Sequence, residues 1–141
     1  ESIGDMLSLH KFGIKNVLVT FGLDVSPHLI SILLGLSPKN IILSFNNDSG
    51  SEFNAGMIGS IKSYLKLLSY FDASKLHICL PLQNDFGEMT KELIDRWINK
   101  KSYNISHHKT LINKLSIEAD KYHKLGKISN NLYKNKKFLN E

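Results

Sequence analysis

The sequence predicts an α/β fold built on an open parallel sheet that is flanked by helices. Three short apolar runs are nearly continuous rather than alternating, as expected for strands that are buried on both faces of a parallel sheet. Between these runs, apolar residues recur at helical spacing, so that strands and helices alternate along the chain. The predicted strands are residues 16–22, 40–45 and 76–82.

The predicted helices carry apolar residues at intervals of three or four positions. Residues 26–36 give the clearest case, because Ser26 is a favourable N-cap and Pro27 occupies the first helical position. Gly126 is expected to end a later helix as a C-cap glycine. The other expected helices lie within residues 1–14, 54–71, 87–100 and 106–126, with a weaker one that frays over 127–140.

The N-terminal helix leads into the predicted strand 16–22, so in a regular alternation it should itself follow a strand. The sequence starts at Glu1, and we therefore expect the first strand to be missing and the chain to be a fragment or a truncated product. An unpaired strand edge would then be exposed, which favours a homodimer through that edge.

Positive charge is concentrated in the last third of the chain. Residues 1–99 hold 8 Lys or Arg against 10 Asp or Glu, whereas residues 100–141 hold 10 Lys against 3 acidic residues. We therefore divide the chain into a body, residues 1–99, and a basic helical extension, residues 100–141. The extension suits a polyanionic partner, nucleic acid first, through lysines such as Lys134, Lys136 and Lys137. The alternative is a solvated lysine-rich surface.

Composition also restricts the setting of the protein. No apolar stretch approaches the roughly 18 to 20 residues that a membrane span requires, so no membrane partner is expected. Cys79 is the single cysteine and lies in the apolar run LHICLPL, where it is expected to be a core thiol. A lone cysteine without a signal peptide favours a reducing, cytoplasmic setting.

Oxygen-bearing side chains follow the predicted strands. Asn46 and Asp48 come directly after strand 40–45, and Asp85 follows strand 76–82 by three residues. Glu1 and Asp5 would lie at the end of the missing strand. Ligands of open parallel sheets bind beyond the carboxyl ends of the strands, and Mg²⁺ takes such oxygen ligands. The alternative is that these residues only form turns and cap helices.

Three motifs in this region resemble the Toprim domain of bacterial and phage DNA primases. ESIGD is similar to the Glu-Gly-x-x-Asp signature that opens the domain. SFNNDSGSEFNAG stands where the family has Asp-x-Asp-x-x-Gly, and LPLQNDFGEM stands where it has a proline-preceded Asp-Pro-Asp. The resemblance covers residues 1–99 and leaves the basic extension unmatched.

The resemblance implies a role for each acidic position. Glu1 corresponds to the glutamate credited with general acid/base work or metal positioning, and Asp5 to the second acidic residue of that motif. Asp48 and Asp85 correspond to ligands of Mg²⁺ (or Mn²⁺), and Asn46 supplies a neutral oxygen where the family has an aspartate.

Three positions depart from the family pattern. Ser2 replaces the signature glycine, Asn46 replaces an aspartate, and Gly87 stands in place of the third motif's second aspartate. Two lost carboxylates should weaken the binding of a metal ion.

By this resemblance, the chain would synthesise RNA primers from nucleoside triphosphates on a single-stranded DNA template, and a replicative helicase is a further expected partner. The template-gripping parts of such primases would precede Glu1, so we expect the chain alone to be inactive. Two alternatives stay open: a Toprim nuclease or topoisomerase, and a non-catalytic module that binds nucleic acid or a helicase.

Overall fold

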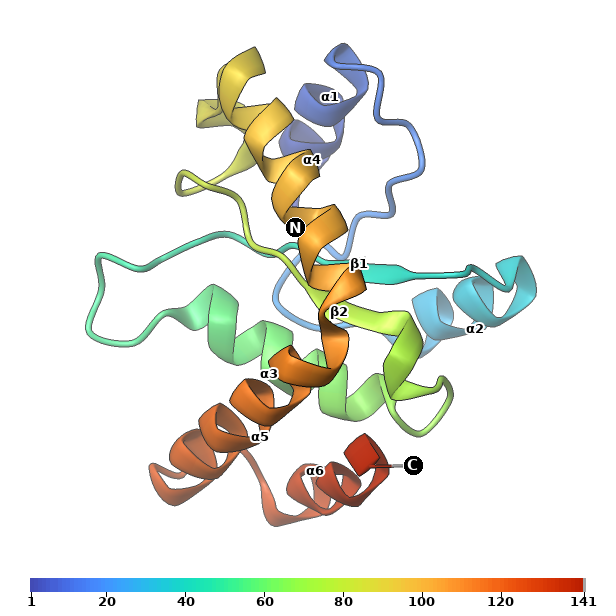
Figure 1. Cartoon of the computed structure of the whole chain (residues 1–141), viewed down its shortest axis with the longest axis vertical. Helices are drawn as coiled ribbons and strands as arrows, with labels where there is room; N and C mark the ends of the chain where they lie inside the picture. The colour runs from blue at the N-terminus through green and yellow to red at the C-terminus, as the bar shows by residue number, and fades with distance from the viewer. Residues whose placement is uncertain (141) are drawn as a thin grey trace.

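A computed structural model describes residues 1–140 of the protein as an α/β fold (Figure 1). A small parallel sheet of two strands lies at its centre, and helices surround it. The main elements are α1 (Ile3–Lys11), α2 (Pro27–Leu36), β1 (Ile41–Leu43), α3 (Ala55–Leu67), β2 (Leu76–Ile78), α4 (Lys91–Ser106), α5 (His108–Lys124) and α6 (Asn130–Tyr133). Three short 3₁₀ helices are η1 (Ala73–Lys75), η2 (Phe86–Glu88) and η3 (Lys134–Asn140). The predicted fold class is therefore confirmed.

The sheet joins the second and third predicted strands. β1 and β2 run parallel, with Ile41 opposite Leu76 and Leu43 opposite Ile78. The pairing continues one residue further, because the Cys79 amide donates to the Leu43 carbonyl at 3.0 Å. Both strands are shorter than the runs 40–45 and 76–82 that predicted them, and both place their ends at the same side of the molecule.

The outer edge of β2 is covered by α4. The Asn104 side chain donates to the Ile78 carbonyl at 3.0 Å, and the Trp97 indole donates to the Cys79 carbonyl at 3.0 Å. Asn104 therefore occupies a backbone acceptor that a further strand would otherwise use, which is one way in which proteins protect a sheet edge. The Cys79 carbonyl also accepts from the Ser44 hydroxyl at 2.8 Å, beside the end of β1.

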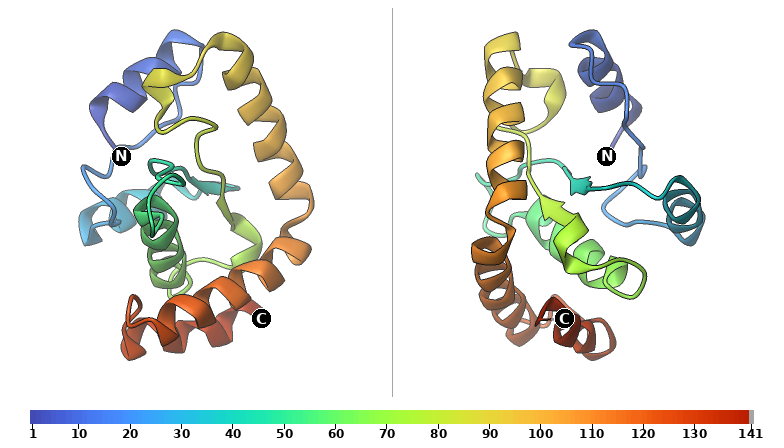
Figure 2. Two further views of the ribbon diagram at one scale, coloured as in Figure 1. Left: turned by 90° about the vertical axis from the view of Figure 1, so that its left-hand side faces the viewer. Right: turned by 45° about the vertical axis from the view of Figure 1, so that its right-hand side comes forward.

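The predicted strand 16–22 is wrong. Residues 14–20 have no regular secondary structure, and Figure 2 shows this stretch as an irregular coil between α1 and α2. A groove of about 550 Å³ is lined by residues 14–20 on one side and by 40–45 on the other. A strand needs a neighbour for its backbone groups, and β1 lies across the groove rather than beside this segment.

Helix starts follow local chemistry closely. Ser26 accepts a hydrogen bond from the Leu29 amide at 3.2 Å, so the predicted cap of α2 is confirmed. Ser2 and Asp5 form a reciprocal capping box at the start of α1. α4 begins at Lys91, with Thr90 as its N-cap, instead of at residue 87 as predicted, because residues 86–88 form η2.

The basic extension packs onto the body of the protein. α5 contributes Ala119 and Tyr122 to the main core, and Ile128 and Leu139 add to it from the segments that follow. These side chains share the core with α3 and both strands. The boundary proposed between residues 99 and 100 falls inside α4 and stays a prediction.

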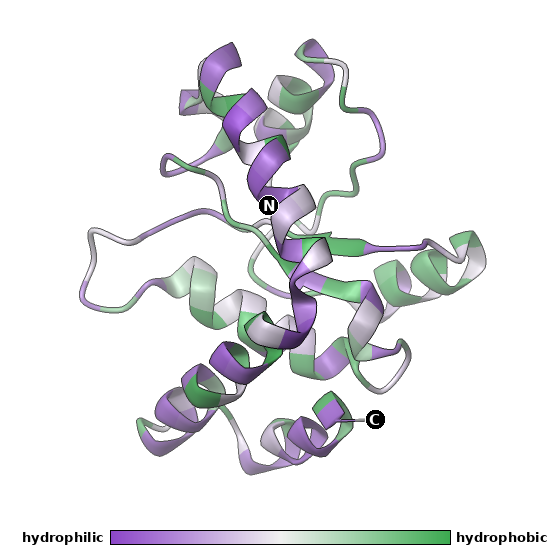
Figure 3. Ribbon diagram, viewed as in Figure 1, coloured by the Kyte–Doolittle hydropathy of each residue, from purple (hydrophilic) through white to green (hydrophobic). Residues whose placement is uncertain are grey.

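Hydropathy is distributed as the fold requires. Figure 3 shows apolar residues on both strands and many hydrophilic residues along α5. A second, smaller core lies where α1, η2 and α4 meet, and it includes Leu9, Phe86 and Trp97. Within residues 1–140, the helices are all too short or too polar to cross a lipid bilayer.

Candidate carboxylate site at the strand ends

Three polar segments meet beyond the carboxyl ends of β1 and β2. The Asn46 amide donates to Glu1 Oε2 at 3.1 Å, which joins the N-terminal segment to the end of β1. The Asn47 amide donates to the Asn84 carbonyl at 2.7 Å, which joins the two loops that follow the strands. The Phe86 amide donates to Asp5 Oδ1 at 3.3 Å. Hydrogen bonds thus connect all three predicted segments. We call the region that they form, residues 1–5, 46–56 and 84–88, the rim.

Asp5 is a buried structural carboxylate. Its side chain accepts hydrogen bonds from the Ser2 amide and the Ser2 hydroxyl, both at 3.1 Å, besides the one from Phe86. The residue is 6% exposed. Because Asp5 is buried and both of its oxygens are bonded inside the protein, it can set the position of α1 against η2 but offers little to a ligand.

The loop after β1 is organised around Asp48 and Asn54. Asp48 Oδ2 accepts from the Gly56 amide at 3.3 Å, and the Asp48 amide donates to Asn54 Oδ1 at 3.0 Å. Asn54 is also the N-cap of α3, because the same oxygen accepts from the Met57 amide. The Asp48 carboxylate therefore faces the start of α3, where the helix dipole favours negative charge.

Sequence reasoning missed the roles of Gly56 and Asn84. A Cβ atom on Gly56 would lie 1.6 Å from the Asn46 carbonyl oxygen, so α3 meets this loop at backbone contact. When the side-chain amide of Asn84 is turned so that its nitrogen faces the surrounding acceptors, that nitrogen donates to Asp48 Oδ1 at 3.1 Å and to the Asn47 carbonyl at 3.2 Å. The only signal for Gly56 was its place in the run NAG at a helix start, and Asn84 gave none.

Asp85 serves as the N-cap of η2. Its Oδ1 accepts from the Glu88 amide at 3.0 Å. A Cβ on Gly87 would lie 3.2 Å from that oxygen, so a larger residue at position 87 would crowd the cap. Gly87, which departs from the family pattern, therefore suits the capping role of Asp85.

A cation at the rim would have to share its ligands with water or a bound substrate. Within residues 1–140, no three His, Cys, Asp or Glu side chains are grouped so that they could hold a metal ion. However, Mg²⁺ commonly uses only one or two carboxylates and fills its shell with water and substrate phosphates. Glu1, Asn46 and Asp48 offer oxygens of that kind on adjoining segments.

The lysines proposed for nucleic acid lie on η3, at the other end of the molecule from α1 (Figure 1). Lys136 Nζ forms an ion pair with Asp120 Oδ1 at 2.6 Å. That hydrogen bond is the main reason why the pKa of Asp120 is lowered and that of Lys136 is raised. Lys134 and Lys137 are exposed. Lys136 is therefore committed to the fold, and the other two are available to a partner.

Comparison with known proteins supports one part of this description. Residues 1–65 match a protein family described as Toprim-like. The matched segment contains Glu1, Asp5, Asn46 and Asp48 and ends within α3, so it does not reach Asp85. No curated protein and no solved structure matches the chain. The match supports a Toprim domain, a type that generally binds Mg²⁺ and occurs in primases, nucleases and topoisomerases.

Proposed function

We propose that the N-terminal part of this chain is the Toprim domain of a DNA primase of the bacterial and phage type. The Toprim-like match over residues 1–65 supports the domain. The observation that carries the proposal is the joining of three polar segments at the carboxyl ends of the strands. The protein would take part in nucleotidyl transfer from nucleoside triphosphates to an RNA primer, in the cytoplasm, during DNA replication.

The residues of the rim would divide this work. A bound Mg²⁺ or Mn²⁺ would offset the negative charge that develops on the reacting phosphates. Glu1, Asn46 and Asp48 would hold the cation together with water and the triphosphate. Asp5 would keep Phe86 and its loop in place, and Asp85 would be a further ligand through the oxygen that does not cap η2.

A cation-binding experiment tests this proposal. We expect Mn²⁺, followed by its electron paramagnetic resonance signal, to bind more tightly when a nucleoside triphosphate is present. The variant Asp48→Asn should weaken that binding by about tenfold or more, since it removes a ligand charge. Asp95→Asn is the matched control, because Asp95 is exposed on α4 and its carboxylate makes none of the hydrogen bonds that join the segments of the rim. Equal binding by both variants would contradict the proposed site.

The departures from the family pattern favour testing a non-catalytic module as the second candidate. Asn46 and Gly87 remove two carboxylates, and the described residues form no three-ligand group. Such a module would bind nucleic acid or a helicase without requiring a cation.

A nuclease or topoisomerase would instead cut supercoiled DNA when Mg²⁺ is added. We expect the chain alone to make no primers, and template-directed synthesis by it would show otherwise.

Single-stranded DNA is the proposed partner of the basic extension. The double variant Lys134→Gln/Lys137→Gln should weaken binding to an oligothymidine and lower the magnitude of the salt dependence, because each lost phosphate contact reduces counterion release. Lys39→Gln/Lys75→Gln removes the same charge from exposed positions elsewhere and should change binding less. Equal losses would mean that overall charge, not η3, attracts DNA.

Two protein partners are proposed as well. A replicative helicase is the expected neighbour of a primase. A homodimer through a sheet edge would have to use β1, since Asn104 of α4 already occupies a backbone acceptor on the outer edge of β2. The free edge of β1 faces the apolar groove that residues 14–20 line. Light scattering across a range of concentrations would detect the dimer, and substituting Ile42 with lysine should then dissociate it.

A further inference from the structure

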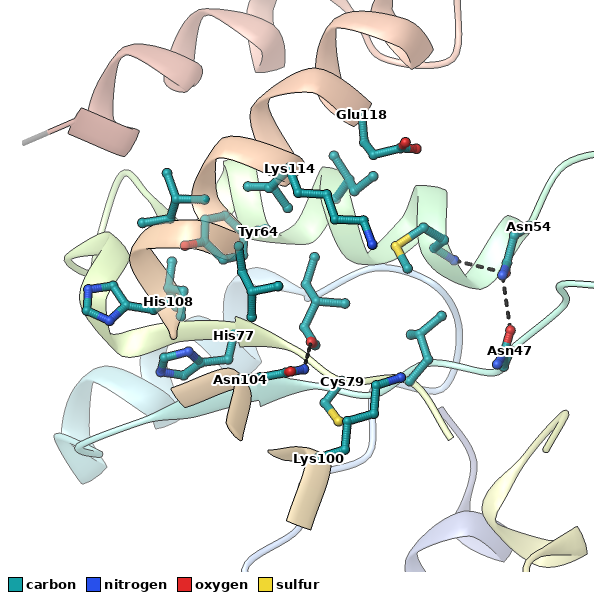
Figure 4. Close-up of a pocket in the computed structure, with 18 residues that line it drawn as sticks. Asn47, Asn54, Tyr64, His77, Cys79, Lys100, Asn104, His108, Lys114 and Glu118 are labelled. Atoms are coloured by element: carbon teal, nitrogen blue, oxygen red, sulfur yellow. Dashed lines mark hydrogen bonds between the residues drawn. The ribbon is translucent and has the colours of Figure 1, made fainter. Parts of the chain in front are cut away.

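A second cavity lies beside β2 and shares no lining residue with the groove described above. It measures about 420 Å³ and is enclosed by α3, β2 and the bend between α4 and α5 (Figure 4). Its lining is mainly apolar, and every one of these elements contributes; the main apolar lining residues are Met57, Ile61, Ile78, Leu80, Ile112 and Leu115. A cavity of this size is typical of sites for small molecules.

The polar groups in the cavity wall are held by the protein itself. Asn104 donates to the Ile78 carbonyl, Asn47 donates to the Pro81 carbonyl at 3.0 Å, and the Tyr64 hydroxyl donates to the Ala73 carbonyl at 3.1 Å. Because these side chains are already bonded to the backbone, they fix the shape of the wall and leave its apolar character largely intact.

Two lysines approach the cavity from different helices. Figure 4 shows Lys100 of α4 and Lys114 of α5 on opposite sides of the space, both among its lining residues. Within residues 1–140, neither amine takes part in an ion pair. Glu118 also lines the cavity but is paired with neither lysine. The amines are therefore available to an anionic group at the mouth.

The pKa values of two buried groups beside the cavity, Cys79 and His77, are affected by nearby positive charge. Burial raises the pKa of the Cys79 thiol to about 11, while Lys100 and Lys101 act in the opposite direction. Burial lowers the pKa of His77, and the charge of His108 lowers it further. The lysines and His108 thus lower the pKa of a neighbouring group in each case, as positive charges do, so the surroundings of the cavity are electropositive.

We propose that this cavity binds a small amphipathic anion, with an apolar body between α3, β2 and α5 and a carboxylate, sulfonate or phosphate between Lys100 and Lys114. The apolar lining accounts for the apolar body, since burial of apolar surface drives such binding. The two unpaired amines account for the negative charge, because hydrogen bonds between ionised groups are stronger than neutral ones. This cavity adjoins the rim, because Asn47 and Asn54 belong to both regions, but its proposed ligand contacts are on Lys100 and Lys114.

Fluorescence titration with anilinonaphthalene sulfonate tests the proposal, because that probe joins aromatic rings to one anionic group. We expect saturable binding of one probe per chain. The variant Lys100→Gln/Lys114→Gln should bind it about tenfold more weakly, as expected when charge-assisted hydrogen bonds are lost. Lys91→Gln/Lys124→Gln removes one charge from each of the same helices, outside the cavity, and should bind as the parent does.

Two further measurements separate the cavity from non-specific binding. The neutral probe phenylnaphthylamine lacks the sulfonate, so the lysine variants should bind it equally. The variant Ile112→Trp should fill the space and abolish the binding of both probes, with an unchanged circular dichroism spectrum showing that the fold is kept. Equal loss in both lysine pairs, several weak sites per chain, or full binding by a folded Ile112→Trp variant would overturn the proposal.

Discussion

Replacing Gly56 with alanine would force α3 away from the loop that follows β1. The new Cβ would lie 1.6 Å from the Asn46 carbonyl oxygen and 2.8 Å from its carbonyl carbon. Because real contacts of this kind are not shorter than 3.0 Å, one backbone segment must move by more than 1 Å. The contact is with backbone on both sides, so no side-chain rotation can relieve it.

The expected cost follows from two opposing effects. Forced overpacking of a well-packed region costs about 1–3 kcal/mol, and the shift also weakens the hydrogen bond from the Gly56 amide to Asp48. Alanine favours a helix over glycine by at most about 1 kcal/mol. We therefore expect Gly56→Ala to lower the free energy of unfolding by about 1–3 kcal/mol.

Urea unfolding, followed by circular dichroism, measures this effect. Gly35→Ala is the matched control, since Gly35 lies within α2 and a Cβ there would meet nothing within 4 Å. That substitution should stabilise the protein by about 0.5–1 kcal/mol through helix propensity alone. If Gly56→Ala stabilised the protein as Gly35→Ala does, the close approach of α3 to Asn46 would be wrong.

Three further outcomes are expected. Asn104→Ala should lower the free energy of unfolding by about 1–2 kcal/mol, because it leaves the Ile78 carbonyl without its donor; an unchanged urea midpoint would contradict this. The pKa of His77 is lowered from 6.5 by burial, so the unfolded chain binds a proton that the folded chain does not, and stability should fall as pH decreases below about 6.5. His77→Gln should flatten that dependence between pH 5 and 7.5, and an equally steep profile would assign it to other groups. Cys79 is 1% exposed with a pKa of about 11, so Ellman's reagent should react with it slowly at pH 8 and rapidly in urea; fast reaction of the folded protein would show that the thiol is accessible.

The sequence predicted well those elements whose signals are local. Ser26 and Pro27 marked the start of α2 because capping depends on a few neighbouring residues. The apolar runs at 40–45 and 76–82 gave the two strands of the sheet. The run at 16–22 is also mainly apolar, yet it formed no strand, because pairing depends on which backbone edge lies beside it. The composition of the segment does not show which backbone edge will lie beside it in the folded chain.

At the candidate site too, the sequence predicted some features and the tertiary structure decided others. The order of polar residues after the strands predicted that distant segments would meet at one rim, and hydrogen bonds between Glu1 and Asn46 and between Asp5 and Phe86 connect them. The burial of Asp5 and the capping role of Asp85 were not foreseen in their detail, since each depends on which amide lies within reach. Their roles toward a metal ion stay predictions.

Sequence alone therefore determined the α/β class, the capped start of α2, the two pairing strands and the concentration of lysines in the last third of the chain. These properties depend on residue type and on short-range spacing, which the chain carries wherever it folds. Tertiary structure alone decided that residues 14–20 stay unpaired, that Gly56 must lack a side chain, and that Lys100 and Lys114 border one cavity. Each of these depends on distances between segments far apart in the chain, which are set only when the helices and the sheet pack together.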